Sequence, residues 1–173
     1  MSEMTLAEQQ HDRPPLDITV RTATGSGRTL LAAFDDALLS AGVANFNLIA
    51  LSSVIPPGSS IREGVTERLA GEHGDRLYCV MSVGYADHPG EIVSAGLGWA
   101  TDATSGGLFV EHSGGSEQSV SEQIQLSLED MSRNRGGGYD DIRQAVIGAH
   151  CVDKPVCALS IAAYRVVSWS ADV

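Results

Sequence analysis

The stretch from Asn45 to Ser60 constrains this chain of 173 residues more than any other. Its sequence, NFNLIALSSVIPPGSS, starts with apolar residues that favour a strand over residues 45–55. Pro56-Pro57-Gly58 then ends the strand, because two prolines remove two backbone N–H donors from a sheet ladder. Ser52 and Ser53 therefore stand near the end of a buried strand, against a rigid turn. A hydroxyl held there is well placed to be aimed at the peptide bond before it.

Apolar periodicity predicts the remaining elements. Strands are expected over residues 16–23, 45–55, 77–85, 92–100, 108–111, 145–152 and 157–167. Helices are expected over residues 29–41 and 119–136, the first capped by Thr29 and the second opened by the capping box Ser119-Val120-Ser121-Glu122. Residues 24–27 are expected to form a loop, and residues 61–74 are ambiguous. About seven strands and two helices that do not alternate strictly indicate an α+β sandwich with helices outside packed sheets.

Length and charge limit the classes of protein. A chain of this size suits one domain, which we expect over residues 16–173 behind a flexible arm at residues 1–15. The net charge of −11 argues against nucleic acid and anionic membrane as partners and is compatible with a small cationic substrate. No apolar run reaches the length of a membrane helix or resembles a signal peptide.

The cysteines and histidines do not indicate a metal site. Cys79, Cys151 and Cys157 are an odd number without metal-ligand spacing, so we expect reduced and mostly buried thiols in a cytoplasmic protein. The five histidines also lack such spacing, and no metal is expected. His112 follows Glu111 directly, and adjacent residues of a strand face opposite ways.

Several segments together resemble the pyruvoyl-dependent arginine decarboxylase family. Asn45–Gly58 carries the most specific string, and Ala33-Phe34-Asp35 and Ala37-Leu38-Leu39 match upstream. Further matches are Pro89-Gly90-Glu91, Ser94-Ala95, Gly107–Glu111 and Ala158–Tyr164. The resemblance implies a four-layer αββα sandwich that assembles as a trimer or a dimer of trimers, with sites between neighbouring protomers.

The resemblance implies self-cleavage between Ser52 and Ser53. The Ser53 hydroxyl would attack the Ser52 carbonyl, and elimination and hydrolysis would leave a pyruvoyl group derived from Ser53 as a covalent cofactor. The products would be a 1–52 chain and a 53–173 chain. Such chemistry needs a positioned nucleophile and donors for the developing oxyanion, and Asn47 is the candidate amide donor. The alternative is that both serines are ordinary residues beside a turn.

The resemblance also implies how the mature enzyme would act on an amino acid. The pyruvoyl ketone would form a Schiff base with the α-amino group, and the electrons released with CO2 would enter the adjacent amide, as with pyridoxal phosphate. Glu111 is the expected general acid, since apolar surroundings would raise its pKa. Asp35 is expected to pair with a guanidinium. The other expected substrate-binding residues are Leu31, Leu38, Asn47 and Ser52.

The expected reaction is the conversion of arginine to agmatine and CO2, and two alternatives stay open. Asp36 stands where the family is expected to have glycine, and Phe46 is larger than the expected aliphatic residue, so another basic or modified amino acid could be the substrate. The other alternative is an unprocessed, non-catalytic structural or regulatory member. Such a scaffold would need none of Asn47, Ser52, Ser53 and Glu111.

Overall fold

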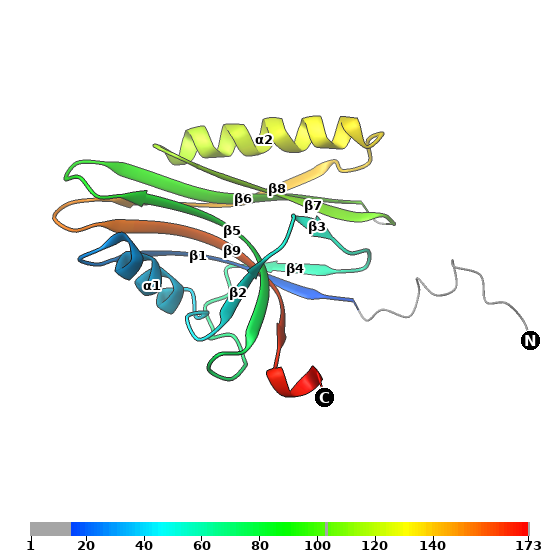
Figure 1. The fold of residues 1–173 in the computed structure, drawn as a ribbon. Helices are drawn as coiled ribbons and strands as arrows, with labels where there is room; N and C mark the ends of the chain where they lie inside the picture. The colour runs from blue at the N-terminus through cyan, green and yellow to red at the C-terminus, as the bar shows by residue number, and fades with distance from the viewer. Residues whose placement is uncertain (1–14, 103, 173) are drawn as a thin grey trace, which may run out of the picture.

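A computed structural model describes residues 15–102 and 104–172, which form two α-helices and nine strands in two sheets (Figure 1). The helices are α1 (Leu30–Ser40) and α2 (Glu117–Asn134), and a 3₁₀-helix spans Trp169–Asp172. The strands are β1 (Asp17–Ser26), β2 (Asn47–Ala50), β3 (Val54–Ile55), β4 (Ser60–Glu63), β5 (Arg76–Ala86), β6 (Ile92–Asp102), β7 (Gly106–Gly114), β8 (Asp141–His150) and β9 (Val156–Val167). The expected α+β class is confirmed.

The two sheets stack on each other. The five-stranded sheet has the order β2-β5-β9-β1-β4, and the four-stranded sheet has the order β3-β7-β6-β8. β5 and β9 of the first sheet lie against β6 of the second, and one hydrophobic cluster, which includes Ile18, Leu97 and Phe109, fills the space between them. α1 packs on β1 and β9, whereas α2 packs on β6, β7 and β8 (Figure 1).

α1 begins and ends where the sequence predicts. Thr29 is the N-cap, and its hydroxyl accepts the N–H of Ala32 at 3.1 Å. Gly42 follows the helix with φ +74°, which glycine adopts without steric cost. The helix lies directly on β1, because a Cβ at Gly25 would meet the Ala37 nitrogen at 2.2 Å. Gly25 is thus a packing position within β1, and the expected loop at residues 24–27 is wrong.

α2 starts one turn earlier than expected. Its N-cap is Ser116, whose hydroxyl accepts the N–H of Ser119 at 3.2 Å, so Ser119 lies inside the helix rather than at its cap. Gly98 lets the helix approach β6, since a Cβ there would meet Ile124 Cγ2 at 2.1 Å. The small residues of this strand therefore serve close packing, as the sequence indicates.

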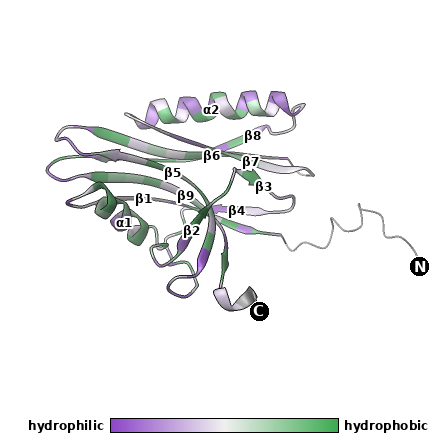
Figure 2. Cartoon of the chain, viewed as in Figure 1, coloured by the Kyte–Doolittle hydropathy of each residue, from purple (hydrophilic) through white to green (hydrophobic). Residues whose placement is uncertain are grey.

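The helices differ in what they leave exposed. α2 buries Val120, Ile124 and Leu128 and turns polar residues outwards, so it appears as mixed purple and green in Figure 2. α1 buries only Ala33, Ala37 and Leu38, and its outer side carries Leu30, Leu31 and Leu39 in exposed positions. In the described part of the chain, neither helix is long and apolar enough to cross a membrane.

The single strand expected over residues 45–55 is wrong. The segment forms two short strands, β2 and β3, that belong to different sheets: β2 pairs with β5, and β3 pairs with β7. The ambiguous region also contains β4, which pairs with the start of β1. These differences account for nine strands among the described residues where seven were expected. The free, buried state of all three cysteines is confirmed.

Candidate active site

The site lies where the chain crosses from one sheet to the other. The N–H of Leu51 donates to the Cys79 carbonyl of β5 at 2.9 Å, which is the last backbone hydrogen bond that residues 47–54 make with the five-stranded sheet. Three residues later, Val54 pairs with Leu108 of β7 in the four-stranded sheet. Ser52 and Ser53 form the crossing between these anchors, and the prolines that follow end β3.

Ser53 is held in an uncommon backbone conformation. Its φ is +69°, and among the described residues it is the only one other than glycine with positive φ. That region costs an L-residue roughly 1–2 kcal/mol, so the surrounding contacts must enforce it. The N–H of Phe109 donates to the Ser53 carbonyl at 2.8 Å, and the Ser53 Oγ donates to Glu111 Oε1 at 2.5 Å. A hydroxyl and a carboxylate are therefore in direct contact, which is the arrangement that a nucleophile and its proton acceptor need.

Glu111 and His112 point to opposite sides of β7, as the sequence predicts. The ring Nε2 of His112 forms a 2.8 Å hydrogen bond with the Ser127 hydroxyl of α2, while Glu111 reaches Ser53. Glu111 is exposed in the single chain. The apolar surroundings expected for its carboxyl are therefore not supplied by this chain alone.

A tyrosine that the sequence analysis did not single out also contacts the crossing. Tyr164 of β9 is buried, and its hydroxyl donates to the Val54 carbonyl at 3.1 Å. Burial, and secondarily the charge of Glu111, raises the pKa of Tyr164, so the phenol stays protonated. The signal was available in the matching segment Ala158–Tyr164, but no chemistry was assigned to it. A pocket of about 710 Å³ opens beside these residues, lined mainly by Leu16, Leu51, Val54, Pro56, Tyr78 and Tyr164.

The other expected site residues lie away from Ser53 within one chain. Asn47 begins β2, and its side chain donates to the Gly74 carbonyl at 2.6 Å. A strand rises about 3.3 Å per residue, which places Asn47 on the order of 15 Å from Ser52. Asp35 and Leu31 are exposed on α1, and no residue of α1 lines the pocket beside Ser53. Leu38 is buried under the helix in the core.

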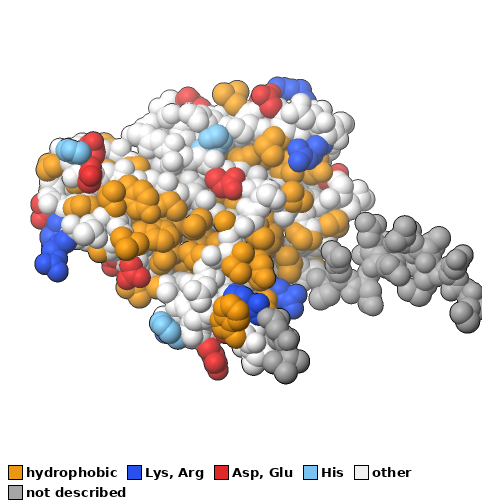
Figure 3. Space-filling view, viewed as in Figure 1, with side chains coloured by type: hydrophobic (Ala, Val, Ile, Leu, Met, Phe, Trp, Pro, Cys, Tyr) orange, Lys and Arg blue, Asp and Glu red, His pale blue; other side chains and the backbone are white. Residues whose placement is uncertain are grey.

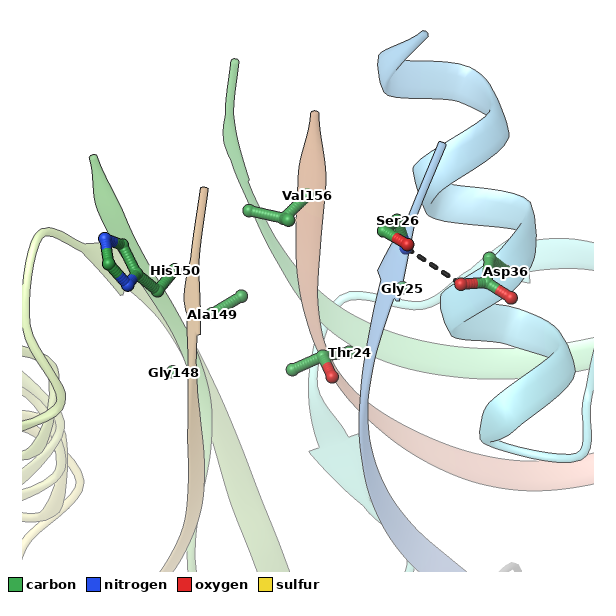
Figure 4. A pocket seen from close by; sticks show the side chains of 8 residues that line it. All are labelled: Thr24, Gly25, Ser26, Asp36, Gly148, Ala149, His150 and Val156. Atoms are coloured by element: carbon green, nitrogen blue, oxygen red, sulfur yellow. Dashed lines mark hydrogen bonds between the residues drawn. The ribbon is translucent and has the colours of Figure 1, made fainter. Parts of the chain in front are cut away.

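The two departures from the family pattern have structural roles. The carboxylate of Asp36 accepts the Ser26 N–H at 2.8 Å and so ties α1 to the end of β1 (Figure 4). It lines a separate pocket of about 330 Å³ between β1 and β8. Phe46 is buried in the same core cluster as Leu38 and Leu77. Within one chain, neither residue lines the pocket beside Ser53.

One other group of ionisable side chains comes together at the turn between β5 and β6. Asp87, His88 and Glu91 bring their potential ligand atoms within 4.8 Å of one another, although the sequence spacing indicated no metal. Glu91 accepts the N–H groups of His88 and Asp87, and these bonds lower its pKa. All three side chains are exposed, and the contacts account for the closed turn.

Comparison with known proteins agrees with the resemblance in the sequence. The family model for pyruvoyl-dependent arginine decarboxylase matches residues 17–168. A protein of that name from Thermococcus kodakarensis is 33% identical over 144 residues, which cover 82% of this chain and 90% of that protein. Its counterpart from Pyrococcus furiosus is 32% identical over 148 residues, covering 84% and 92%. One from Halobacterium salinarum is 43% identical over 94 residues, covering 53% and 58%. The chain belongs to the pyruvoyl-dependent arginine decarboxylase family.

Proposed function

We propose that this protein is a self-processing, pyruvoyl-dependent decarboxylase that converts L-arginine to agmatine and CO2. The observation that carries the proposal is the hydrogen bond from Ser53 to Glu111 at a residue with φ +69°. A serine that only ends a strand needs neither a carboxylate at 2.5 Å nor a left-handed backbone. Family membership supplies the reaction that such a serine would serve.

The contact between Ser53 and Glu111 would allow self-cleavage by proton transfer, acyl transfer, elimination and hydrolysis. Glu111 accepts the proton of the Ser53 hydroxyl, and Oγ forms a bond to the carbonyl carbon of Ser52. The Ser52–Ser53 C–N bond breaks with protonation of the nitrogen, which leaves an ester. Loss of the Ser53 α-proton expels the Ser52 carboxylate and leaves dehydroalanine at position 53. Its imine tautomer takes up water and releases ammonia, so that the net reaction consumes one water and yields chains 1–52 and 53–173.

Residue 53 fits the pyruvoyl group that would result. The group supplies a ketone that condenses with an α-amino group and an amide carbonyl that takes up the electrons left by CO2. The Ser53 carbonyl, which would become that amide carbonyl, already accepts the Phe109 N–H at 2.8 Å. Glu111, beside the same residue, would hold the proton for the substrate carbon. Glu111 would thus accept a proton during self-cleavage and donate one during decarboxylation, from the same position.

Apart from Ser52, substrate recognition is assigned to residues that one chain does not bring to Ser53. Asp35 carries a free, exposed carboxylate suited to a guanidinium, and Leu31 lies one turn before it on α1. Leu38, Asn47 and Ser52 complete the proposed set. We assign Asp35, Leu31, Leu38 and Asn47 to a site shared with a neighbouring protomer, where they would meet the Ser53 and Glu111 of the next chain.

The exposed surface supports assembly. Leu31 is 77% exposed, and Leu39 and Val54 are also exposed large apolar residues. Figure 3 shows hydrophobic side chains gathered in a band across the face that carries α1 and reaching the middle of the molecule. A patch of this kind on a small protein marks an interaction surface. We propose four-layer αββα protomers that form a trimer or a dimer of trimers, in the cytoplasm, where the three buried thiols stay reduced.

Denaturing intact mass of the purified protein tests the processing. We expect two species, cut between Ser52 and Ser53, of which the larger lacks an N-terminal amine and reacts with borohydride. A single uncut species would favour the non-catalytic alternative. Release of CO2 from a panel of basic amino acids then tests the substrate. Arginine should be preferred, and a preference for another amino acid would leave the processing intact but replace the substrate.

A further inference from the structure

The crossing at Ser52 and Ser53 is held by backbone contacts on both sides, and each side contacts a different sheet. On its N-terminal side, the Leu51 backbone bonds to Cys79 of β5. On its C-terminal side, Val54 pairs with β7 of the other sheet. The only side chain with a hydrogen bond to the backbone of residues 51–55, among those described, is Tyr164, whose hydroxyl donates to the Val54 carbonyl. Because β9 belongs to the five-stranded sheet, this bond ties the two sheets together one residue beyond Ser53.

Tyr164 occupies an irregular position in its own strand. In the pairing of β5 with β9, Tyr78 lies opposite Arg165 and Cys79 lies opposite Ala163, so Tyr164 has no partner in β5. The pairing of β9 with β1 also begins only at Ala163. Bulges of this kind occur beside active sites, where they direct a side chain. Here the residue left outside the ladder reaches the scissile segment.

The Tyr164 side chain is fixed by its neighbour on β7. Its ring packs against that of Phe109, with 6.0 Å between the ring centroids. The Phe109 N–H in turn holds the Ser53 carbonyl. The two consecutive carbonyls after the scissile bond, those of Ser53 and Val54, are therefore held by two donors that support each other. The donor from Phe109 is a backbone N–H of β7, which no substitution of its side chain removes. The donor from Tyr164 is a side-chain hydroxyl, which Tyr164→Phe removes while the sheet is kept.

We propose that Tyr164 is a positioning residue for self-cleavage: its hydroxyl holds the Val54 carbonyl and thereby keeps Ser53 at positive φ with its Oγ aimed at the Ser52 carbonyl. The inference rests on the proposed self-processing and names a residue that controls it. Tyr164 takes no proton in the reaction. Without the Tyr164 hydroxyl, the Val54 carbonyl loses its side-chain donor, and Leu51, Val54 and Pro56 border a pocket into which the segment can shift, which would release Ser53 from positive φ.

Tyr78 provides a matched control. It lines the same pocket, and its hydroxyl has no hydrogen bond to another described residue. Tyr164→Phe and Tyr78→Phe each remove one hydroxyl from the same wall, but only the first removes a donor to the crossing. Full-length chains would be made by cell-free synthesis, and the uncut fraction would be followed over time by denaturing intact mass, with and without hydroxylamine. Hydroxylamine cleaves the ester at Ser52 and leaves a hydroxamate there, so it reports the attack step alone.

We expect Tyr164→Phe to split about tenfold more slowly than the unaltered chain, the effect of one net hydrogen bond on a barrier. Hydroxylamine should not restore the rate, because the attack itself is slowed, and Tyr78→Phe should split normally. Thermal unfolding in a Ser53→Ala background should place Tyr164→Phe within a few degrees of its parent.

Three results would overturn the inference. Splitting of Tyr164→Phe at the normal rate would remove the role altogether. Restoration of the normal rate by hydroxylamine would show that the attack is intact and that a later step is affected. A large fall in the unfolding temperature would assign the effect to general stability. If the unaltered chain itself stays in one piece, the proposed function fails, and the inference falls with it.

Discussion

Ser53 Oγ and Glu111 Oε1 lie 2.5 Å apart, although 58 residues separate them in the sequence. One short strand pairing, that of β3 with β7, brings them together. β3 places Ser53 beside β7, and Glu111 lies three residues beyond Leu108, the partner of Val54. The contact is therefore a property of the four-stranded sheet and exists before any cut is made.

The identity of the nucleophile gives the first prediction. Ser53→Ala should yield a single uncut chain without decarboxylase activity, because the attacking oxygen is gone. Ser52→Ala is the matched control, since it keeps both the scissile carbonyl and the Ser53 hydroxyl, and it should still split. Denaturing intact mass measures both. Cleavage of Ser53→Ala between residues 52 and 53 would contradict the mechanism.

The role of Glu111 gives the second prediction. Glu111→Gln keeps the size of the side chain but removes the proton acceptor, so self-cleavage should slow by about 10²–10⁴-fold, the usual contribution of a general base. The time course of splitting in cell-free synthesis measures it. Glu122→Gln, at an exposed position of α2, should split normally. Equal rates for Glu111→Gln and the unaltered chain would assign Glu111 to substrate chemistry alone.

How far the sequence predicts this site depends on which residues one examines. Thr29, Gly42 and the strand that carries Glu111 were predictable, because helix caps and apolar runs are local signals. The break between β2 and β3 was not, because residues 48–55 are apolar apart from two serines. Their sheet membership depends on the partners that β5 and β7 offer. Tyr164 was missed for the same reason, since its partner carbonyl lies 110 residues away.

The outer side of α1 gives the third prediction. Leu31→Glu should reduce the assembled mass and lower decarboxylase activity at least tenfold, because a buried charge at an interface costs more than the apolar contact it replaces. Leu126 offers a control at 62% exposure on α2, and Leu126→Glu should leave the assembly unchanged. Light scattering after size exclusion measures both. A trimer that survives Leu31→Glu would place the interface elsewhere.

The fourth prediction concerns the contact between α2 and β6. Gly98→Ala should lower the free energy of unfolding by about 1–3 kcal/mol, because the added methyl group would overlap Ile124. Gly115→Ala, which has open space around it, serves as the control. Denaturant unfolding of both variants in the Ser53→Ala background measures the difference. Equal stability would mean that α2 moves away from the sheet at little cost.

The buried thiols give the fifth prediction. Burial raises the pKa of Cys79 and of Cys157 to about 11, from an ordinary value of 9.0. The unfolded chain therefore loses these protons first, so the contribution of the two thiols to stability should be constant below pH 9 and should fall between pH 9 and 11, by about 2–3 kcal/mol for each thiol. Unfolding of the Ser53→Ala chain at a series of pH values measures the slope. The double variant Cys79→Ala with Cys157→Ala should make the slope shallower between pH 9 and 10, below the range in which the tyrosines titrate, and an unchanged slope there would rule the thiols out.

The position of the proposed cut has a consequence for how the protein is made. Residues 1–52 supply α1, β2 and β1, and β1 lies inside the five-stranded sheet between β9 and β4, both of which come from residues 53–173. The two pieces thus share one sheet and would stay together after the peptide bond is lost. The protein would fold, however, as a continuous precursor chain, before the bond between Ser52 and Ser53 is cut. Once denatured, the mature protein would have to rebuild each protomer by a bimolecular encounter of unequal fragments, whereas a precursor protomer can fold from a single chain before it assembles.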